Sequence, residues 1–76
     1  MNKINLSDMK TGDIATVDKL LSDSSMRRRL QDIGLIEGTC VECIMRSPGG
    51  DPIAYQIRGA VIALRKEDAE NILISV

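Results

Sequence analysis

Two cysteines, Cys40 and Cys43, stand in a C-x-x-C spacing that can hold a metal ion or carry out thiol–disulfide exchange. Residues three apart on a strand point to opposite faces, however, and this pair lies among residues typical of a strand. A zinc site needs two more ligands, and none stands at suitable spacing. A redox pair normally opens a helix, where the thiolate pKa is lowered. The pattern favours core or near-core packing of both thiols over a metal or redox role.

The sequence lacks a recognisable arrangement of residues for acid–base or covalent catalysis. The chain has no histidine, no Ser or Cys nucleophile with a histidine partner, and no carboxylate pair with catalytic spacing. The glycine-rich stretch Ser47–Pro52 lacks the complete phosphate-binding pattern and is predicted to be a loop. We therefore expect a protein without enzymatic activity and without a cofactor.

Three consecutive arginines, Arg27, Arg28 and Arg29, are the second chemical feature. They fall near the start of a predicted helix, where the helix dipole disfavours positive charge. They could form a solvated face, with Arg28 and Arg29 pairing with Asp32. Our hypothesis is that they form a protein-docking surface together with Met26 and Leu35, because locally unfavourable charge often marks a functional site. The loop around Pro48 and Asp51 is a second candidate contact region.

The helix that would carry these arginines has marked ends. Asp23, Ser24 and Ser25 all suit an N-cap, and with Ser25 as the cap a narrow apolar stripe of Met26, Leu30 and Ile33 faces the core. Gly34 should follow the helix in a left-handed conformation, and Leu35 should then contact Leu30.

The rest of the chain reads as short strands joined by tight turns. A two-residue turn at Arg58-Gly59 should form a hairpin, and Lys66–Asn71 should form one helical turn. Imperfect alternation in the first strand indicates either a bulge at one end or a strand with both faces packed. We predict a mainly β, small five-stranded barrel with one short helix inserted after the first strand, as a single domain spanning residues 1–76. The predicted strands are Ile14–Leu21, Thr39–Arg46, Ile53–Ile57, Ala60–Leu64 and Ile72–Val76.

Composition excludes several classes of partner. The net charge is −1 and Tyr55 is the single aromatic residue, so nucleic-acid binding and proline-ligand binding are not expected. Apolar runs such as Ala60–Leu64 are too short to span a bilayer, and residues 1–10 lack the features of a secretion signal. We therefore expect a cytoplasmic protein that does not insert into the membrane.

An ordered set of motifs resembles the FeoA family. It begins with Gly12-Asp13 and continues with Arg29-Leu30, Asp32, Gly34-Leu35 and Gly38. It ends with Pro48, Gly50-Asp51-Pro52-Ile53, Arg58-Gly59, Leu64-Arg65 and Ala69, so that the resemblance covers nearly the whole chain. It implies an SH3-like barrel that serves as a cytosolic accessory of the membrane ferrous iron transporter, which has a cytosolic G-protein domain. Arg29 is a matching position of the pattern.

Two alternatives and one question stay open. The same barrel is similar to the C-terminal module of some metal-dependent repressors, which would imply a metal-sensing or regulatory role; no DNA-binding domain precedes it, which favours the accessory role. The chain could instead be a GTPase-activating protein, in which one of the three arginines would enter the active site of a G protein. A homodimer is also left open.

Overall fold

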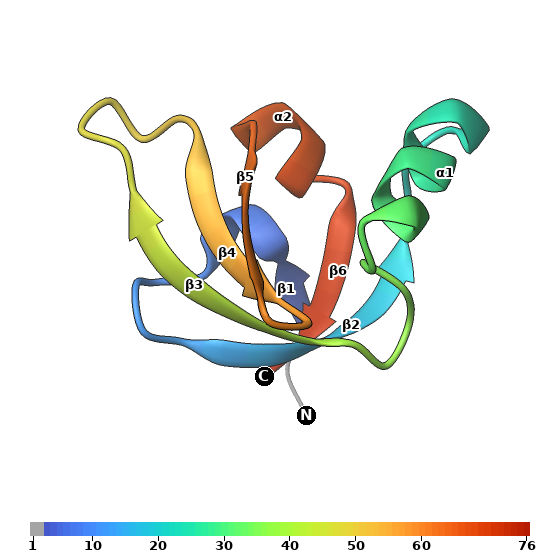
Figure 1. Cartoon of the computed structure of the whole chain (residues 1–76), viewed down its shortest axis with the longest axis horizontal. Helices are drawn as coiled ribbons and strands as arrows, with labels where there is room; N and C mark the ends of the chain where they lie inside the picture. The colour runs from blue at the N-terminus through green and yellow to red at the C-terminus, as the bar shows by residue number, and fades with distance from the viewer. Residues whose placement is uncertain (1–2) are drawn as a thin grey trace.

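The computed structural model describes residues 3–76 as a strongly bent antiparallel sheet with two helices at its rim (Figure 1). The six strands follow the spatial order β1-β6-β2-β3-β4-β5. Their bounds are β1 Lys3–Asn5, β2 Ile14–Leu20, β3 Cys40–Arg46, β4 Ile53–Ile57, β5 Ala60–Leu64 and β6 Ile72–Ser75. The helical segments are η1 Leu6–Asp8, a single 3-10 turn, and the helices α1 Ser24–Asp32 and α2 Lys66–Ala69.

The expected five strands are all present, and a sixth, β1, was missed. No strand was predicted before Ile14, but Lys3–Asn5 pair with Ser75–Leu73 of β6. Three residues are too few to show a period-2 pattern, so only the pairing defines this strand. The last strand, β6, lies between β1 and β2 and pairs with both of them. Within residues 3–76 the hydrogen-bonded order ends at β1 and β5, which are the two edges.

The local predictions for the strands hold at most positions. The side chains of β4 alternate between buried and accessible positions as expected, with Ile53, Tyr55 and Ile57 buried. A register shift between Val17 and Lys19 confirms the predicted bulge in β2. Strand β2, the first of the predicted strands, ends at Leu20, one residue before its predicted end.

One cluster of aliphatic side chains fills the inside of the bent sheet. It consists of residues from every strand except β1, together with α1, α2, η1 and the segments that flank them. Tyr55 is the one aromatic member; it is fully buried and donates a hydrogen bond from its hydroxyl to the carbonyl oxygen of Leu6 at 3.1 Å. Burial raises the pKa of the Tyr55 hydroxyl above its usual range, so the proton that makes this bond is firmly held.

Arg46 ties the N-terminal segment to the sheet. Its guanidinium donates to the carbonyl oxygens of Ser7 and, at 2.7 Å, Met9. Together with the Tyr55 hydroxyl it satisfies three carbonyl groups of a short segment that has little regular hydrogen bonding of its own. This role of Arg46 was not predicted, because its hydrogen-bond partners lie more than thirty residues earlier in the chain.

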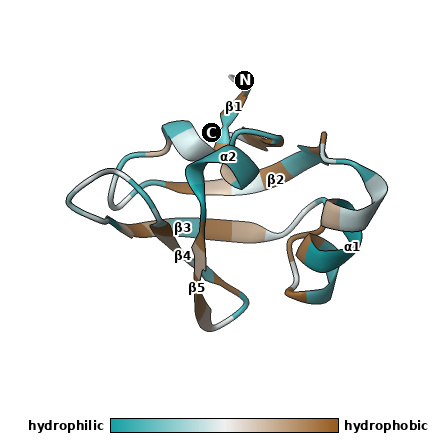
Figure 2. Ribbon diagram, turned by 90° about the horizontal axis from the view of Figure 1, so that it is seen from above, coloured by the Kyte–Doolittle hydropathy of each residue, from teal (hydrophilic) through white to brown (hydrophobic). Residues whose placement is uncertain are grey.

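The tight turns form as the sequence predicts. Ile57 pairs with Ala60 across Arg58 and Gly59, whose φ angles are 51° and 84°, so this is a two-residue turn with both residues left-handed. Lys66–Ala69 forms the expected helical turn, and Ser47–Pro52 forms the expected loop. Seen from above, the β4–β5 hairpin projects to one side, and α1 stands beside it at the end of β2 and β3 (Figure 2).

Candidate functional site

Helix α1 begins two residues earlier than predicted, because Asp23 is its N-cap in place of Ser25. The Asp23 carboxylate accepts a hydrogen bond from the backbone N–H of Met26 at 2.9 Å. The arginines consequently begin at the fourth helical position instead of the second. This shift removes much of the expected dipole penalty, because a carboxylate now occupies the N-terminus and the arginines lie beyond the first three helical residues.

The helix ends at the predicted point. The Leu35 N–H donates to the Leu30 carbonyl at 2.9 Å, and the Gly34 N–H donates to the Gln31 carbonyl at 3.0 Å. With Gly34 at a φ of 98°, these two bonds make the Schellman ending that the Gly34-Leu35 pair predicts. Both leucines belong to the main core cluster.

The predicted apolar stripe is only partly buried. Leu30 is in the core and Met26 packs against it, but Ile33 keeps 38% of its surface exposed. Ile33 is the C-cap residue, where the chain leaves the helix, and its side chain turns toward the rim of a groove. The stripe prediction was therefore wrong for Ile33, and this error adds an apolar side chain to the accessible surface.

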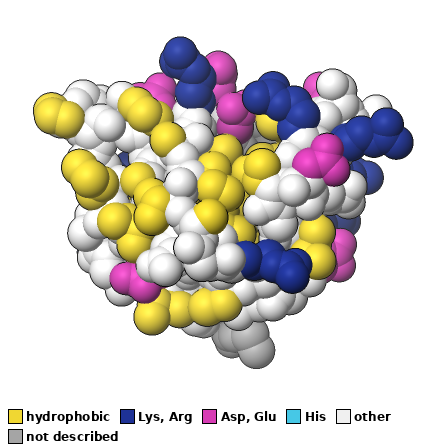
Figure 3. Space-filling model, viewed as in Figure 1, with side chains coloured by type: hydrophobic (Ala, Val, Ile, Leu, Met, Phe, Trp, Pro, Cys, Tyr) yellow, Lys and Arg dark blue, Asp and Glu magenta, His cyan; other side chains and the backbone are white. Residues whose placement is uncertain are grey.

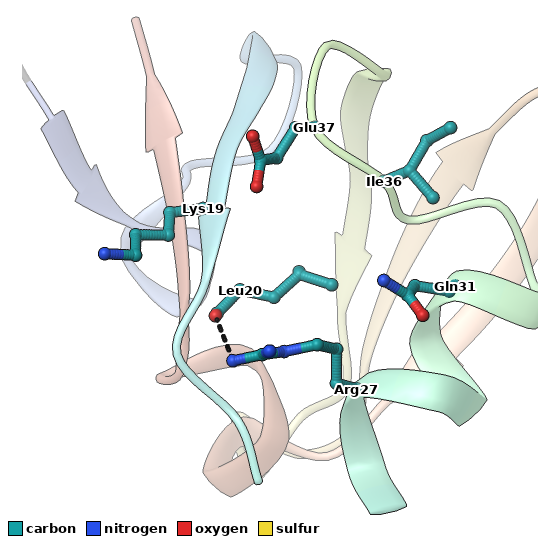
Figure 4. A pocket seen from close by; sticks show the side chains of 6 residues that line it. All are labelled: Lys19, Leu20, Arg27, Gln31, Ile36 and Glu37. Atoms are coloured by element: carbon teal, nitrogen blue, oxygen red, sulfur yellow. Dashed lines mark hydrogen bonds between the residues drawn. The ribbon is translucent and has the colours of Figure 1, made fainter. Parts of the chain in front are cut away.

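Arg27 has a structural role. It lies across a groove between β2 and α1, and its guanidinium donates to the carbonyl oxygen of Leu20 at 3.4 Å (Figure 4). It also donates to the carbonyl oxygen of Ser22 at 3.4 Å. Leu20 is the last residue of β2, and Ser22 lies in the segment between β2 and α1. Arg27 thus holds the helix against the strand that precedes it, and its guanidinium is only partly available to a partner.

Arg28 and Arg29 do not form the ion pairs with Asp32 that a solvated helix face would have allowed. In the part of the chain that the structure describes, the one salt bridge joins Lys3 to Asp18 at 3.2 Å. Both arginines are exposed, and their guanidinium groups have no hydrogen-bond partner within residues 3–76. They are therefore available to an acidic partner without first breaking an internal bond.

A groove between α1 and the edge strand β5 brings apolar and charged side chains together. Its volume is about 180 Å³, and Leu30 and Leu64 form its buried floor. The remaining lining residues are Met26, Arg29, Ile33, Ile62, Ala63 and Asp68. Figure 3, oriented as Figure 1, shows hydrophobic side chains gathered over β5 and the space beside it, with basic side chains around this area. We refer to this feature as the α1–β5 groove.

The predicted contact residues on α1 and at its C-terminal end differ in their accessibility. Met26 and Arg29 line the α1–β5 groove, and Arg28 lies on the exposed face of the same helix. Leu35 is fully buried, so its assignment to an accessible docking surface was wrong. The predicted contact of Leu35 with Leu30 at the Schellman ending is what buries its side chain.

Pro48 and Asp51 belong to the exposed β3–β4 loop and line neither groove. The Asp51 carboxylate accepts a hydrogen bond from the backbone N–H of Lys66 at 2.9 Å, at the start of α2. Asp51 thus satisfies an otherwise unpaired helix N–H group. This contact gives Asp51 a structural role that its spacing in the sequence did not reveal.

The two cysteines point to opposite faces of β3, as the spacing predicts. Cys43 is fully buried in the core as predicted, whereas Cys40 is exposed, so the prediction that both thiols pack in or near the core was wrong for Cys40. Burial raises the pKa of the Cys43 thiol, whose sulfur lies 3.9 Å from the carbonyl oxygen of Met9. Within residues 3–76 no three Cys, Asp or Glu side chains are grouped closely enough to hold a metal ion together.

Three residues of the α1–β5 groove, Ile33, Ile62 and Ala63, were not identified from the sequence. Each was counted as a core or strand residue, and the groove arises only when the edge strand and the helix exit are placed side by side. The one signal in the sequence was that Ala60–Leu64 carries no charge although arginines flank it at Arg58 and Arg65. Edge strands usually carry charges, so an uncharged edge strand can indicate a binding surface.

Comparisons with known proteins agree with this architecture. The FeoA domain model matches residues 4–76. A Porphyromonas gingivalis protein described as an Fe(2+) transport protein A/Fe(2+) transporter FeoB fusion protein is 30% identical over 71 residues; the match covers 93% of this chain, which spans only 8% of that relative's length. Within residues 3–76, no helix has the length and apolar content needed to cross a bilayer.

Two solved structures extend the agreement to the fold. The FeoA protein of Chlorobium tepidum is 34% identical with a TM-score of 0.91, and the match covers 96% of this chain and 70% of that one. The FeoA of Stenotrophomonas maltophilia, solved with zinc and described as a prokaryotic SH3 domain protein, is 25% identical with a TM-score of 0.84; the match covers 95% of this chain and 89% of that one. The SH3-like fold is thus confirmed. Because the family model spans residues 4–76, the chain belongs to the FeoA family, which is linked to ferrous iron transport.

Proposed function

We propose that this chain is a non-enzymatic accessory of ferrous iron transport that binds the cytosolic part of the membrane transporter, including its G-protein domain. The fusion relative supports this proposal, because there the two components are joined in one polypeptide. Two domains that are covalently linked in one protein act close to one another, and separate chains of the same families need a contact surface to achieve the same proximity.

The α1–β5 groove is the surface that best suits such a contact. The observation that carries this choice is the convergence of accessible apolar side chains, including Met26, Ile33 and Ile62, beside the unpaired guanidinium of Arg29. Protein interfaces commonly combine an apolar centre with charged groups at the rim, and arginine is enriched in them.

The rim charge has a separate role in this proposal. Arg28 and Arg29 lie on the exposed face of α1, and neither is in an ion pair within the described part of the chain. Rim charges mainly raise the association rate and fix orientation, whereas buried apolar contacts slow dissociation. We expect charge reversal at Arg28 to slow association and to make binding less sensitive to salt.

Co-purification with the soluble cytosolic region of the transporter, with and without guanine nucleotide, tests the proposal. We expect retention in at least one nucleotide state. Phosphate release from the G-protein domain, measured with and without this chain in the same samples, separates binding alone from an effect on the nucleotide cycle. Absence of retention in both states would refute the proposed function.

A further inference from the structure

The strand β5 is an edge that lacks the features by which proteins usually protect sheet edges. Its five residues, Ala60–Leu64, include no charged residue and no proline, and they pair with β4 without a bulge. The opposite edge, β1, is only three residues long and begins with Lys3. Short edge strands and lysine both discourage the addition of another strand, so β1 is protected and β5 is not.

The hairpin geometry identifies which backbone groups of β5 are unused. A two-residue turn closes with a hydrogen-bonded pair, here Ile57 and Ala60, and such pairs then alternate along an antiparallel ladder. The N–H and C=O groups of Val61 and Ala63 therefore point away from β4. No other backbone or side-chain bond within residues 3–76 uses these groups.

The side chains around β5 favour a particular kind of added strand. Arg58 and Arg65 flank the two ends of β5, and Arg29 lies across the groove. No ion pair within residues 3–76 includes any of these three arginines. Asp68 is the one carboxylate among the groove-lining residues. The basic surroundings thus complement an extended segment with acidic residues at its ends.

The same charges disfavour pairing of β5 with a second copy of this chain. In a two-fold antiparallel pairing centred on Ile62, Gly59 of one copy would face Arg65 of the other. Arg58 and Arg65 would then gather at both ends of the new pair, and like charges placed opposite one another destabilise strand pairing. The charge pattern therefore favours a different, acidic partner over self-association.

From these observations we infer that the edge of β5 accepts an extended, acid-ended apolar segment of a partner protein as a seventh strand, beside α1. Strand addition of this kind obtains affinity from main-chain hydrogen bonds and specificity from side chains that enter adjacent pockets. Alternate side chains of the added strand would enter the α1–β5 groove. The inference rests on the proposed function for the identity of the partner, but not for the mode of binding.

Amide exchange in the isotope-labelled full chain tests the mode of binding directly. The probe is a short synthetic peptide of alternating valine and threonine with glutamate at both ends, and the same peptide with lysine ends is the control. We expect the glutamate-ended peptide to slow exchange of the Val61 and Ala63 amides about tenfold, and the lysine-ended peptide to slow it much less. Unchanged exchange with both peptides would overturn the inference, as would slowing that depends only on the concentration of the protein itself.

Substitutions in the edge strand β5 test the same inference independently of amide exchange. Val61→Pro removes an outward N–H group without breaking the β4–β5 ladder, and Val61→Thr keeps that group with a similar shape. We expect about tenfold weaker peptide binding for Val61→Pro and unchanged binding for Val61→Thr. Ala63→Pro repeats the test if Val61→Pro does not fold. Equal binding by the proline and threonine variants would overturn the inference.

The transporter's soluble cytosolic region, tested with the same variants, separates the two proposals. If the peptide binds at β5 but the cytosolic region does not bind at all, the proposed function fails and the strand-addition site stands. If the cytosolic region binds Val61→Pro and Val61→Thr equally well, the proposed function stands and strand addition is overturned.

Discussion

The side chain of Arg58 lies directly over Gly34. A β-carbon placed on Gly34 would sit 2.7 Å from Cδ of Arg58, which is closer than two such atoms can approach. Gly34 ends α1, and Arg58 begins the turn between β4 and β5. The contact therefore joins the helix exit to the hairpin, and the exposed Arg58 side chain would have to move to accommodate a β-carbon at Gly34.

Gly34→Ala should be strongly destabilising because two effects add. The φ angle of 98° is unfavourable for alanine, at a cost of about 1–3 kcal/mol, and the new methyl group would overlap Arg58. In the background of Arg58→Ala the overlap is relieved while the φ penalty remains. We expect a coupling of at least about 0.5 kcal/mol between the two substitutions in urea unfolding. Strictly additive effects would contradict the contact.

Arg27 and Arg28 are neighbours with different roles, which stability measurements can separate. Arg27→Met removes hydrogen bonds to the carbonyl oxygens of Leu20 and Ser22 and should cost about 0.5–1.5 kcal/mol. Arg28→Met is the matched control and should change the free energy of unfolding by less than about 0.5 kcal/mol. Equal effects of the two substitutions would argue against a structural role for Arg27.

Tyr55 and Cys43 make the stability of the fold fall at alkaline pH. Burial raises the pKa of both groups above their usual values of 10.0 and 9.0, so the folded chain keeps protons that the unfolded chain releases. The unfolded state then binds fewer protons, and the free energy of unfolding decreases as the pH rises above about 9. Urea unfolding at pH 7 and near pH 11 should differ by about 1 kcal/mol or more.

Tyr55→Phe provides the control for this pH dependence. It should cost about 0.5–1.5 kcal/mol at neutral pH, because the carbonyl oxygen of Leu6 loses one of its two donors and keeps only the N–H of Met9. It should also reduce the alkaline loss of stability, since one of the two groups that hold a proton is gone. An unchanged alkaline slope would show that other groups cause it.

The cysteines should react at very different rates. Cys40 is exposed, whereas Cys43 is buried and its pKa is raised, so its thiolate is both scarce and inaccessible. A thiol reagent at neutral pH should modify one cysteine quickly and the second only on the time scale of unfolding. Peptide mapping should identify Cys40 as the fast site. Rapid modification of Cys43 in the folded chain would contradict its place in the core.

Local signals predicted the fold well because much of it is locally encoded. The Gly34-Leu35 helix end and the two-residue turn at Arg58-Gly59 each depend on a few adjacent residues, and both were predicted correctly. The choice of Asp23 over Ser25 as N-cap was not predictable, since adjacent residues offered similar side chains. Strand β1 was missed because only its pairing with β6 defines it.

The candidate site was harder to predict because it depends on tertiary placement. Leu35 and Ile33 are both apolar and adjacent to the helix end, yet one is buried and the other lies at the rim of the groove. Nothing in their types distinguishes them. Likewise, Arg27 was indistinguishable from Arg28 until the carbonyls that it binds were placed beside it.

The most direct test of the central claim is the calorimetric affinity of the transporter's soluble cytosolic region for Ile33→Glu and for a matched control. Ile33 lies at the rim of the α1–β5 groove, whereas Met45 is a similarly exposed apolar residue on β3 that lines neither groove. We predict that Ile33→Glu weakens binding at least about tenfold while Met45→Glu leaves it unchanged. Wild-type affinity for Ile33→Glu would contradict binding through the groove.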